Sequence, residues 1–67
     1  MLKISDFTSP ELDYFSAVCN FTPDEQWLFD LRREHKSLED CAEIMSLSGA
    51  TISRIHQKIL SKIEREM

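Results

Sequence analysis

Two cysteines and two histidines are the residues of this chain that could hold a metal ion: Cys19, His35, Cys41 and His56. Zinc sites in small domains usually draw their ligands in close pairs, such as C-x2-C or H-x3-H. No two of these four residues stand that close, so we expect no metal site. A zinc site built from four separated residues is the weaker alternative, and the cysteines are expected to be small buried hydrophobic residues.

Patterns typical of catalysis are also missing. The sequence has no Gly-rich phosphate loop and no Ser–His–Asp or Cys–His grouping in a known motif context. The chain has 67 residues, and domains of this size bury only about 60% of the surface that the unfolded chain exposes. That leaves no room for a substrate cleft with its own lid, so we expect neither an enzyme nor a bound cofactor.

The charges are distributed unevenly along the chain. Residues 1–46 contain four basic and ten acidic residues, a formal net charge of −6, whereas residues 47–67 contain four basic and two acidic residues, a net charge of +2. The overall net charge of −4 disfavours non-specific binding to phosphates. A basic last segment on an acidic body therefore indicates one element with a separate role.

The composition is typical of a single all-α domain. Hydrophobic residues make up 42% of the chain and charged residues 30%, with one Gly and two Pro. No apolar stretch approaches the roughly 20 residues that a membrane span needs, and the first six residues lack the apolar core of a secretory signal. We expect a cytoplasmic protein with no membrane partner.

Capping patterns place the first two helices. The segments S-P-E, at 9–11, and T-P-D-E, at 22–25, each put a hydroxyl residue before Pro and acidic residues in the first turn. Thr22 and Glu25 also fit a capping box. We predict helices over about 10–19 and 23–35, the first with Ser9 as its N-cap and an inward face that includes Leu12, Phe15, Val18 and Cys19.

Two further helices follow. Ser37 caps a predicted helix over 38–45, and Ser48 caps a predicted helix over about 49–65. At 100° per residue, the isoleucines of the last helix share one side, and Arg54, Ser61, Arg65 and Lys58 share the other. This helix is therefore expected to be apolar inward and basic outward.

The first eight residues and the aromatic residues complete the structural prediction. Residues 1–8 form an N-terminal arm in which Leu2, Ile4 and Phe7 alternate as in a strand. Trp27 and the four Phe are expected to be core residues rather than platforms for stacked bases.

Residues 38–57 meet the physical requirements of a helix-turn-helix. Such a pair needs a small residue where the helix backbones approach, and Ala42 lies there. It also needs apolar flanking positions, which are Cys41, Met45, Leu47, Ile52 and Ile55. The second helix must begin with small or polar residues, which are Gly49, Ala50, Thr51, Ser53 and Arg54.

Taken together with the capping patterns, these residues make the stretch 21–63 resemble region 4 of bacterial sigma factors and the related LuxR-type domains. The matching segments are T-P-D-E at 22–25, L-R at 31–32, K-S-L-E-D-C-A-E-I-M at 36–45 and L-S-G-A-T-I-S-R-I-H-Q-K-I-L-S-K-I at 47–63. The resemblance implies a DNA-binding transcriptional regulator of bacterial or phage origin. It also implies pairing of two copies through the terminal helix.

The chain departs from the family pattern in two places. Ser46 stands where the family's turn commonly has Gly, so we expect a strained or differently shaped turn. Gly49 and Ala50 stand where promoter-reading members carry Arg, Glu or Gln. The residues left for reading base edges are Thr51, Ser53, Arg54 and Gln57.

Among these candidates, Arg54 can pair bidentately with guanine and Gln57 with adenine. The candidates for phosphate contacts are Ser48, Lys36, Arg33, Lys58 and Arg65. A dimer interface is expected on the flank of the last helix, at Leu60, Met67 and His56.

Two other interpretations remain open. Arg54, Lys58 and Arg65 are also compatible with the solvated face of an ordinary amphipathic helix. The acidic first segment and the plain Gly49-Ala50 pair favour a protein-interaction module. Such a module would dock on RNA polymerase, or on a sigma or anti-sigma partner, without reading DNA.

Overall fold

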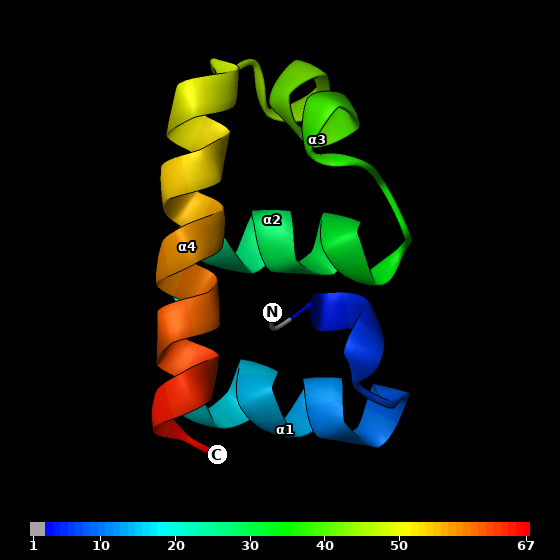
Figure 1. The fold of residues 1–67 in the computed structure, drawn as a ribbon, viewed down its shortest axis with the longest axis vertical. Coiled ribbons are helices and arrows are strands. Elements are labelled where there is room, and N and C mark those ends of the chain that lie inside the picture. The colour runs from blue at the N-terminus through cyan, green and yellow to red at the C-terminus, as the bar shows by residue number, and fades with distance from the viewer. Residues whose placement is uncertain (1–2) are drawn as a thin grey trace.

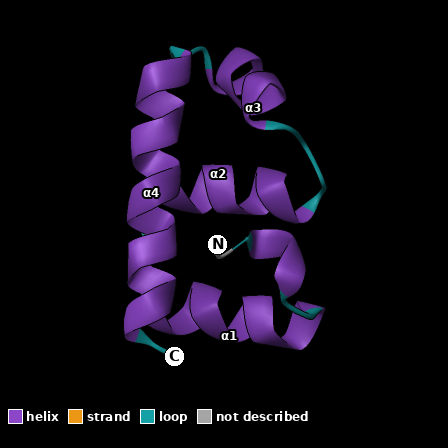
Figure 2. Ribbon diagram, in the orientation of Figure 1, coloured by secondary structure: helices purple, strands orange, loops and turns teal. Residues whose placement is uncertain are grey.

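Residues 3–67, which the computed structural model describes, fold into helices joined by short loops (Figure 2). The elements are a 3-10 helix, η1 (Ile4–Asp6), and four α-helices, α1 (Ser9–Val18), α2 (Pro23–Arg33), α3 (Leu38–Met45) and α4 (Gly49–Arg65). The predicted all-α, four-helix fold is confirmed. The largest difference in bounds is at α2, which ends at Arg33 rather than at 35.

The longest helix, α4, runs along one edge of the molecule, and the other helices meet it along its length (Figure 1). α3 lies at its N-terminal end, α2 crosses its middle, and α1 lies at its C-terminal end. α2 packs against α4, α3 and η1, and α3 packs against α4. One long face of α4 is therefore covered, and the opposite face is left to solvent.

Reciprocal capping boxes begin α1 and α2. At α2, Thr22 N–H donates to Glu25 Oε1 at 3.0 Å, and Glu25 N–H donates to Thr22 Oγ1 at 3.3 Å. At α1 the same arrangement joins Thr8 and Glu11. The prediction of Ser9 as N-cap was wrong by one position, because Glu11 lies three residues after Thr8 and only that spacing closes the box.

The turn between α3 and α4 has a defined stereochemistry. Ser46 adopts a left-handed conformation with φ 56° and ψ 41°. Leu47 N–H donates to Ala42 O at 3.0 Å, and Ser46 N–H donates to Glu43 O at 3.2 Å. These two bonds form a Schellman motif, so the turn has the backbone that glycine favours, with serine in its place.

A single core joins all the elements. Its buried apolar residues are Ile4, Leu12, Phe15, Cys19, Leu28, Phe29, Leu31, Cys41, Met45, Ile52, Ile59 and Ile63. Ile4 is only 1% exposed. The expectation of a strand-like arm is therefore wrong for this segment, which is a 3-10 helix against α2; Leu2, also assigned to that arm, lies outside the described residues.

Two predicted core residues lie at the surface. Trp27 is 45% exposed and Val18 is 38% exposed. The inward side of α2 is centred between Leu28 and Phe29, and at 100° per residue Trp27 falls beyond its edge. At the C-terminal end of α1, Cys19 faces the core and is buried, whereas the neighbouring Val18 faces solvent.

Candidate nucleic-acid interface

The N-terminal end of α4 is capped by Ser48. Thr51 N–H donates to Ser48 Oγ at 3.2 Å, and the two hydroxyl oxygens lie 2.9 Å apart. This cap satisfies one of the free N–H groups of the first turn and leaves those of Gly49 and Ala50 without an intrahelical partner. The Ser48 oxygen already accepts from Thr51 N–H. A phosphate at this end of the helix would therefore accept hydrogen bonds from the N–H groups of Gly49 and Ala50 and from the Ser48 hydroxyl.

The same end of α4 is open. A Cβ placed on Gly49 would meet no atom within 4 Å. The first turn of α4 carries no acidic residue, whereas the first turns of α1, α2 and α3 all do. The positive end of the helix dipole is therefore not neutralised by the helix's own side chains.

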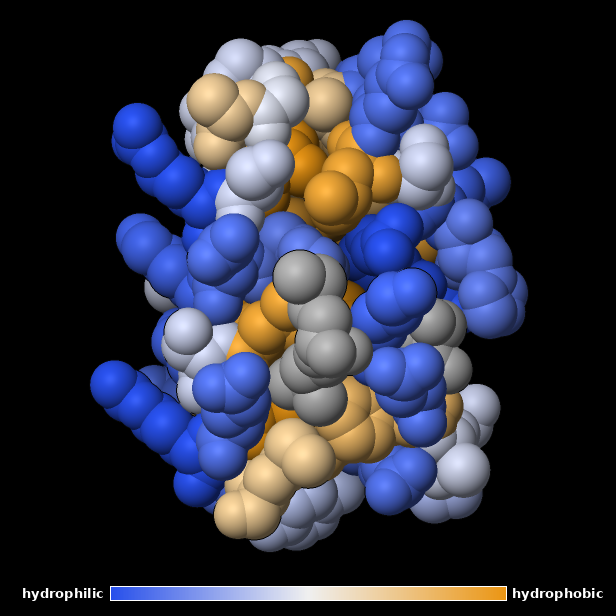
Figure 3. All heavy atoms as spheres, in the orientation of Figure 1, coloured by the Kyte–Doolittle hydropathy of each residue, from blue (hydrophilic) through white to orange (hydrophobic). Residues whose placement is uncertain are grey.

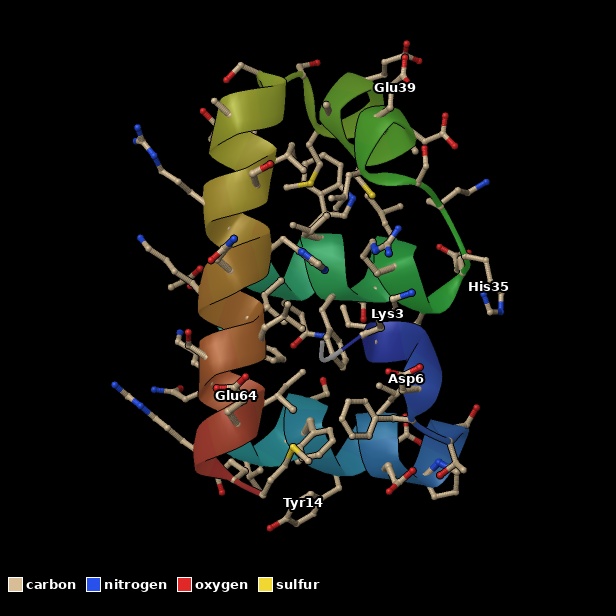
Figure 4. All side chains as sticks on the ribbon, viewed as in Figure 1. Lys3, Asp6, Tyr14, His35, Glu39 and Glu64 are labelled. Atoms are coloured by element: carbon tan, nitrogen blue, oxygen red, sulfur yellow. The ribbon has the colours of Figure 1, made fainter. Side chains whose placement is uncertain are left out.

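The predicted base-reading residues lie along one side of α4. Ser53, Arg54 and Gln57 are exposed, and Thr51 is half-buried next to its cap. Nitrogen-bearing side chains project from this side, away from the rest of the molecule (Figure 4). We name Ser53, Arg54, Gln57, Lys58 and Arg65 the outer face of α4, and all five are exposed.

A shallow hollow of about 240 Å³ lies on the C-terminal half of this face. It is lined by Gln57, Lys58, Ser61, Lys62 and Arg65. The structure thus brings two of the predicted phosphate ligands, Lys58 and Arg65, beside one predicted base reader, Gln57. The sequence pattern did not single out Ser61 for the site, although the helical wheel places it on the same side of the helix as Lys58 and Arg65.

Lys62 faces inward from the edge of the hollow. Its ammonium group forms an ion pair and hydrogen bond with the buried Glu25 and lies 5.9 Å from the centre of the Phe21 ring. Burial alone would raise the pKa of Glu25, but hydrogen bonds from Lys62 and Thr22 outweigh it and hold that pKa below the ordinary value. Lys62 therefore joins α4 to the start of α2, a role that the sequence pattern did not reveal.

Two further predicted phosphate ligands, Arg33 and Lys36, lie elsewhere. Arg33 forms a salt bridge of 2.8 Å with Asp13 of α1. Lys36 is exposed in the loop that joins α2 to α3, and this loop lies on the side of the molecule opposite α4 (Figure 1). Neither side chain belongs to the outer face of α4.

The residues predicted for a dimer interface do not form one exposed surface. Met67 is 72% exposed, whereas Leu60 is half-buried against the core. His56 is also half-buried, with its Nε2 atom enclosed and without a hydrogen-bond partner. Burial and the nearby Arg32 lower the pKa of His56, so the imidazole is neutral at pH 7.

Carboxylates border the candidate interface in two places. Glu64 of α4 is exposed near the C-terminal end of the helix (Figure 4). Glu39, Asp40 and Glu43 are exposed on α3, which adjoins the opposite end of α4. They would repel a phosphate backbone that extended over α3.

The cysteines and histidines remain separate. Within residues 3–67, no three side chains of His, Cys, Asp or Glu come together in a way that could hold a metal ion. Cys19 and Cys41 are free and buried, and burial raises the pKa of both thiols. In the same residues, no helix combines the length and apolarity required to cross a bilayer.

No protein-family model, curated protein or solved structure matches this chain. The similarity to sigma region 4 and LuxR-type domains therefore rests on the segments quoted from the sequence and stays a prediction.

Proposed function

We propose that this protein is a sequence-specific DNA-binding transcriptional regulator that places α4 in the major groove. The observation that carries the proposal is the outer face of α4. Arg54, Lys58 and Arg65 are exposed there, and within residues 3–67 none of them pairs with a carboxylate. An unpaired cationic helix face beside an open helix N-terminus suits a polyanion.

The residues divide by the chemistry they can do. Arg54 and Gln57 carry planar groups that can bond two atoms of one base edge, and Thr51 and Ser53 offer single hydroxyls. Lys58 and Arg65, beside the hollow on α4, are suited to phosphates and would set the register of the helix. Ser48 and the adjacent amides would hold a further phosphate.

Three or four phosphate contacts set the strength of binding. At about 0.9 per phosphate, they correspond to a slope of roughly −3 to −4 in the logarithm of affinity against the logarithm of salt concentration. The acidic body reduces this attraction, so one copy would bind duplex weakly. We therefore propose a homodimer in the cytoplasm, with half-sites about 10 bp apart.

The exposed carboxylates Glu39, Asp40 and Glu43 on α3 favour a second candidate function. A domain with this acidic surface would dock on RNA polymerase, or on a sigma or anti-sigma partner, without contacting DNA. The two candidates differ in one simple property, which is retention of the protein on duplex DNA at low salt.

Selection of bound duplexes from a random pool tests the proposal. We expect one enriched motif, and we expect Arg54→Ala to weaken binding to it by about 1–3 kcal/mol. Lys3→Ala removes an equal charge from an exposed residue that lies outside α4 and should leave base preference unchanged. A pool without enrichment, or an Arg54→Ala protein with wild-type affinity, would exclude base reading by this face.

A further inference from the structure

A second surface lies at the far end of the molecule from the open end of α4. An apolar groove of about 500 Å³ is formed where η1 and α1 meet the C-terminal end of α4. Its lining includes Phe7, Pro10, Tyr14, Phe15 and Met67. Figure 3 shows this region as apolar spheres at the lower end of the displayed face.

The floor of the groove is aromatic and fixed. Phe7 and Phe15 stack edge to face with ring centres 5.0 Å apart, and Tyr14 lies 5.7 Å from Phe15 in a similar geometry. Phe15 is a core residue, so the floor is held by the fold. Tyr14 is 54% exposed, and its ring therefore adds apolar surface to the groove that the monomer does not bury.

The rim of the groove is acidic. Glu11 and Glu66 complete its lining. Within residues 3–67 neither carboxylate forms a salt bridge; the salt bridges there join Arg33 to Asp13 and Lys62 to Glu25. The capping box fixes Glu11 in place: its Oε1 accepts from Thr8 N–H at 2.8 Å.

We propose that this groove docks an apolar side chain of a cationic helical segment belonging to another protein. The aromatic floor would take the apolar anchor, and the two glutamates would pair with Lys or Arg one turn away from it. A second copy of this chain fits less well, because it would bring its own Glu11 and Glu66 to an already acidic rim. The inference goes beyond DNA binding and does not depend on it.

Fluorescence anisotropy with a labelled amphipathic peptide tests the groove. The probe carries Lys on its polar face and one Phe anchor, and its control has Ala in place of Phe. We expect Tyr14→Ala to weaken binding of the Phe probe at least fivefold and to leave the Ala control nearly unaffected. Val18→Ala truncates an exposed residue of the same helix outside the groove and should change binding less than twofold.

Charge is tested by a matched pair of substitutions. Glu66→Gln should weaken binding of the Phe probe at least threefold at low salt. Glu64→Gln removes the same charge from an exposed residue that does not line the groove and should not weaken binding. Equal effects of the two substitutions would show only general attraction to an acidic protein and would overturn the proposal. So would a wild-type dimer in sedimentation that Tyr14→Ala dissociates, because a second copy would then occupy the groove.

The outcome is separable from the proposed DNA function. Tyr14 and Glu66 are not on the outer face of α4, so their substitutions should leave affinity for duplex unchanged. Loss of probe binding together with loss of duplex binding would indicate general damage to the fold and would contradict a separate docking surface.

Discussion

Within residues 3–67, three residues other than glycine take left-handed backbone conformations at helix ends: Asn20 (φ 53°), His35 (φ 65°) and Ser46 (φ 56°). The single glycine, Gly49, has no positive φ and no neighbour that a Cβ would touch. The fold therefore does not require glycine at the one position that has it. Its absent side chain leaves the start of α4 accessible to a close partner, which agrees with the proposed approach of a phosphate backbone.

Ser46→Gly should stabilise the protein by about 0.5–1 kcal/mol, because a left-handed conformation strains a residue with a Cβ and does not strain glycine. The free energy of unfolding in urea measures the change. Ser53→Gly makes the same substitution on the exposed side of α4 and should instead destabilise by about 0.3–0.5 kcal/mol. If both variants lose stability, the account of the α3–α4 turn is incorrect.

Glu25→Gln should destabilise the protein by about 1–3 kcal/mol at pH 7. Gln keeps the hydrogen bonds of the capping box but leaves Lys62 without its counter-charge, and the partial exposure of Lys62 limits the loss below that of a fully buried pair. Urea unfolding at several pH values measures the loss.

The pH dependence of this loss has a fixed sign. Because the pKa of Glu25 is lowered in the folded state, its contribution is present above the ordinary carboxyl pKa of about 4.3 and disappears as the pH falls through the folded value. The difference between Glu25→Gln and wild type should therefore shrink toward pH 3. Glu64→Gln, on an exposed residue, should show no such trend, and a pH-independent Glu25→Gln difference would contradict the role of the ion pair.

At the scale of elements, α2, α3 and α4 meet around Arg32 and His56. Arg32 Nη1 donates to Lys36 O at 2.6 Å, which ties the end of α2 to the loop before α3. The Nε atom of Arg32 and the Nε2 atom of His56 are both buried without a hydrogen-bond partner. Protonation of His56 would place a second positive charge beside Arg32 at the junction of three helices.

Stability should therefore fall as the pH drops below about 6.5, the ordinary histidine pKa. The folded state lowers the pKa of His56 and so binds fewer protons than the unfolded state in this range. His56→Gln should flatten the dependence of the urea midpoint between pH 7 and 5.5, whereas His35→Asn, at an exposed position, should preserve it. An unchanged slope in His56→Gln would remove this assignment.

The four helices, and the caps of α2, α3 and α4, were predictable because the signals are local. Thr22–Glu25, Ser37 and Ser48 act as caps through hydrogen bonds within three residues, and the isoleucine stripe of α4 follows one helical period. Two of the missed features depend on contacts distant in sequence. Ile4 enters the core from the segment that precedes α1, and Lys62 is held by Glu25, which lies 37 residues away in the sequence.

The same local signals predicted the part of the candidate site that lies on α4, but they did not predict the positions of the candidate residues outside α4. The face shared by Arg54, Gln57, Lys58 and Arg65 follows from helical periodicity. Arg33 and Lys36 were assigned to the same site without knowledge of where the end of α2 would lie. Their separation from α4 is a tertiary property, as is the groove between α1 and α4, which no sequence pattern indicated.

At the scale of the whole molecule, the Cα radius of gyration is 11.0 Å, about the value expected for a compact domain of this length. Within that small body, the cationic outer face of α4 and the acidic apolar groove lie on different parts of the surface. The net charge of −4 makes general attraction to DNA weak. Affinity for duplex must therefore come from the outer face of α4 itself, and this requirement makes the proposal specific.

Titration of ¹⁵N-labelled protein with a duplex selected from the random pool, followed by amide chemical shifts, tests this claim most directly. The account predicts that the largest shifts fall on residues 48–58 and on Arg65, with little change along α1 and α2. Absence of shifts at low salt, or shifts confined to α3 or to the groove beside Tyr14, would contradict DNA recognition by α4.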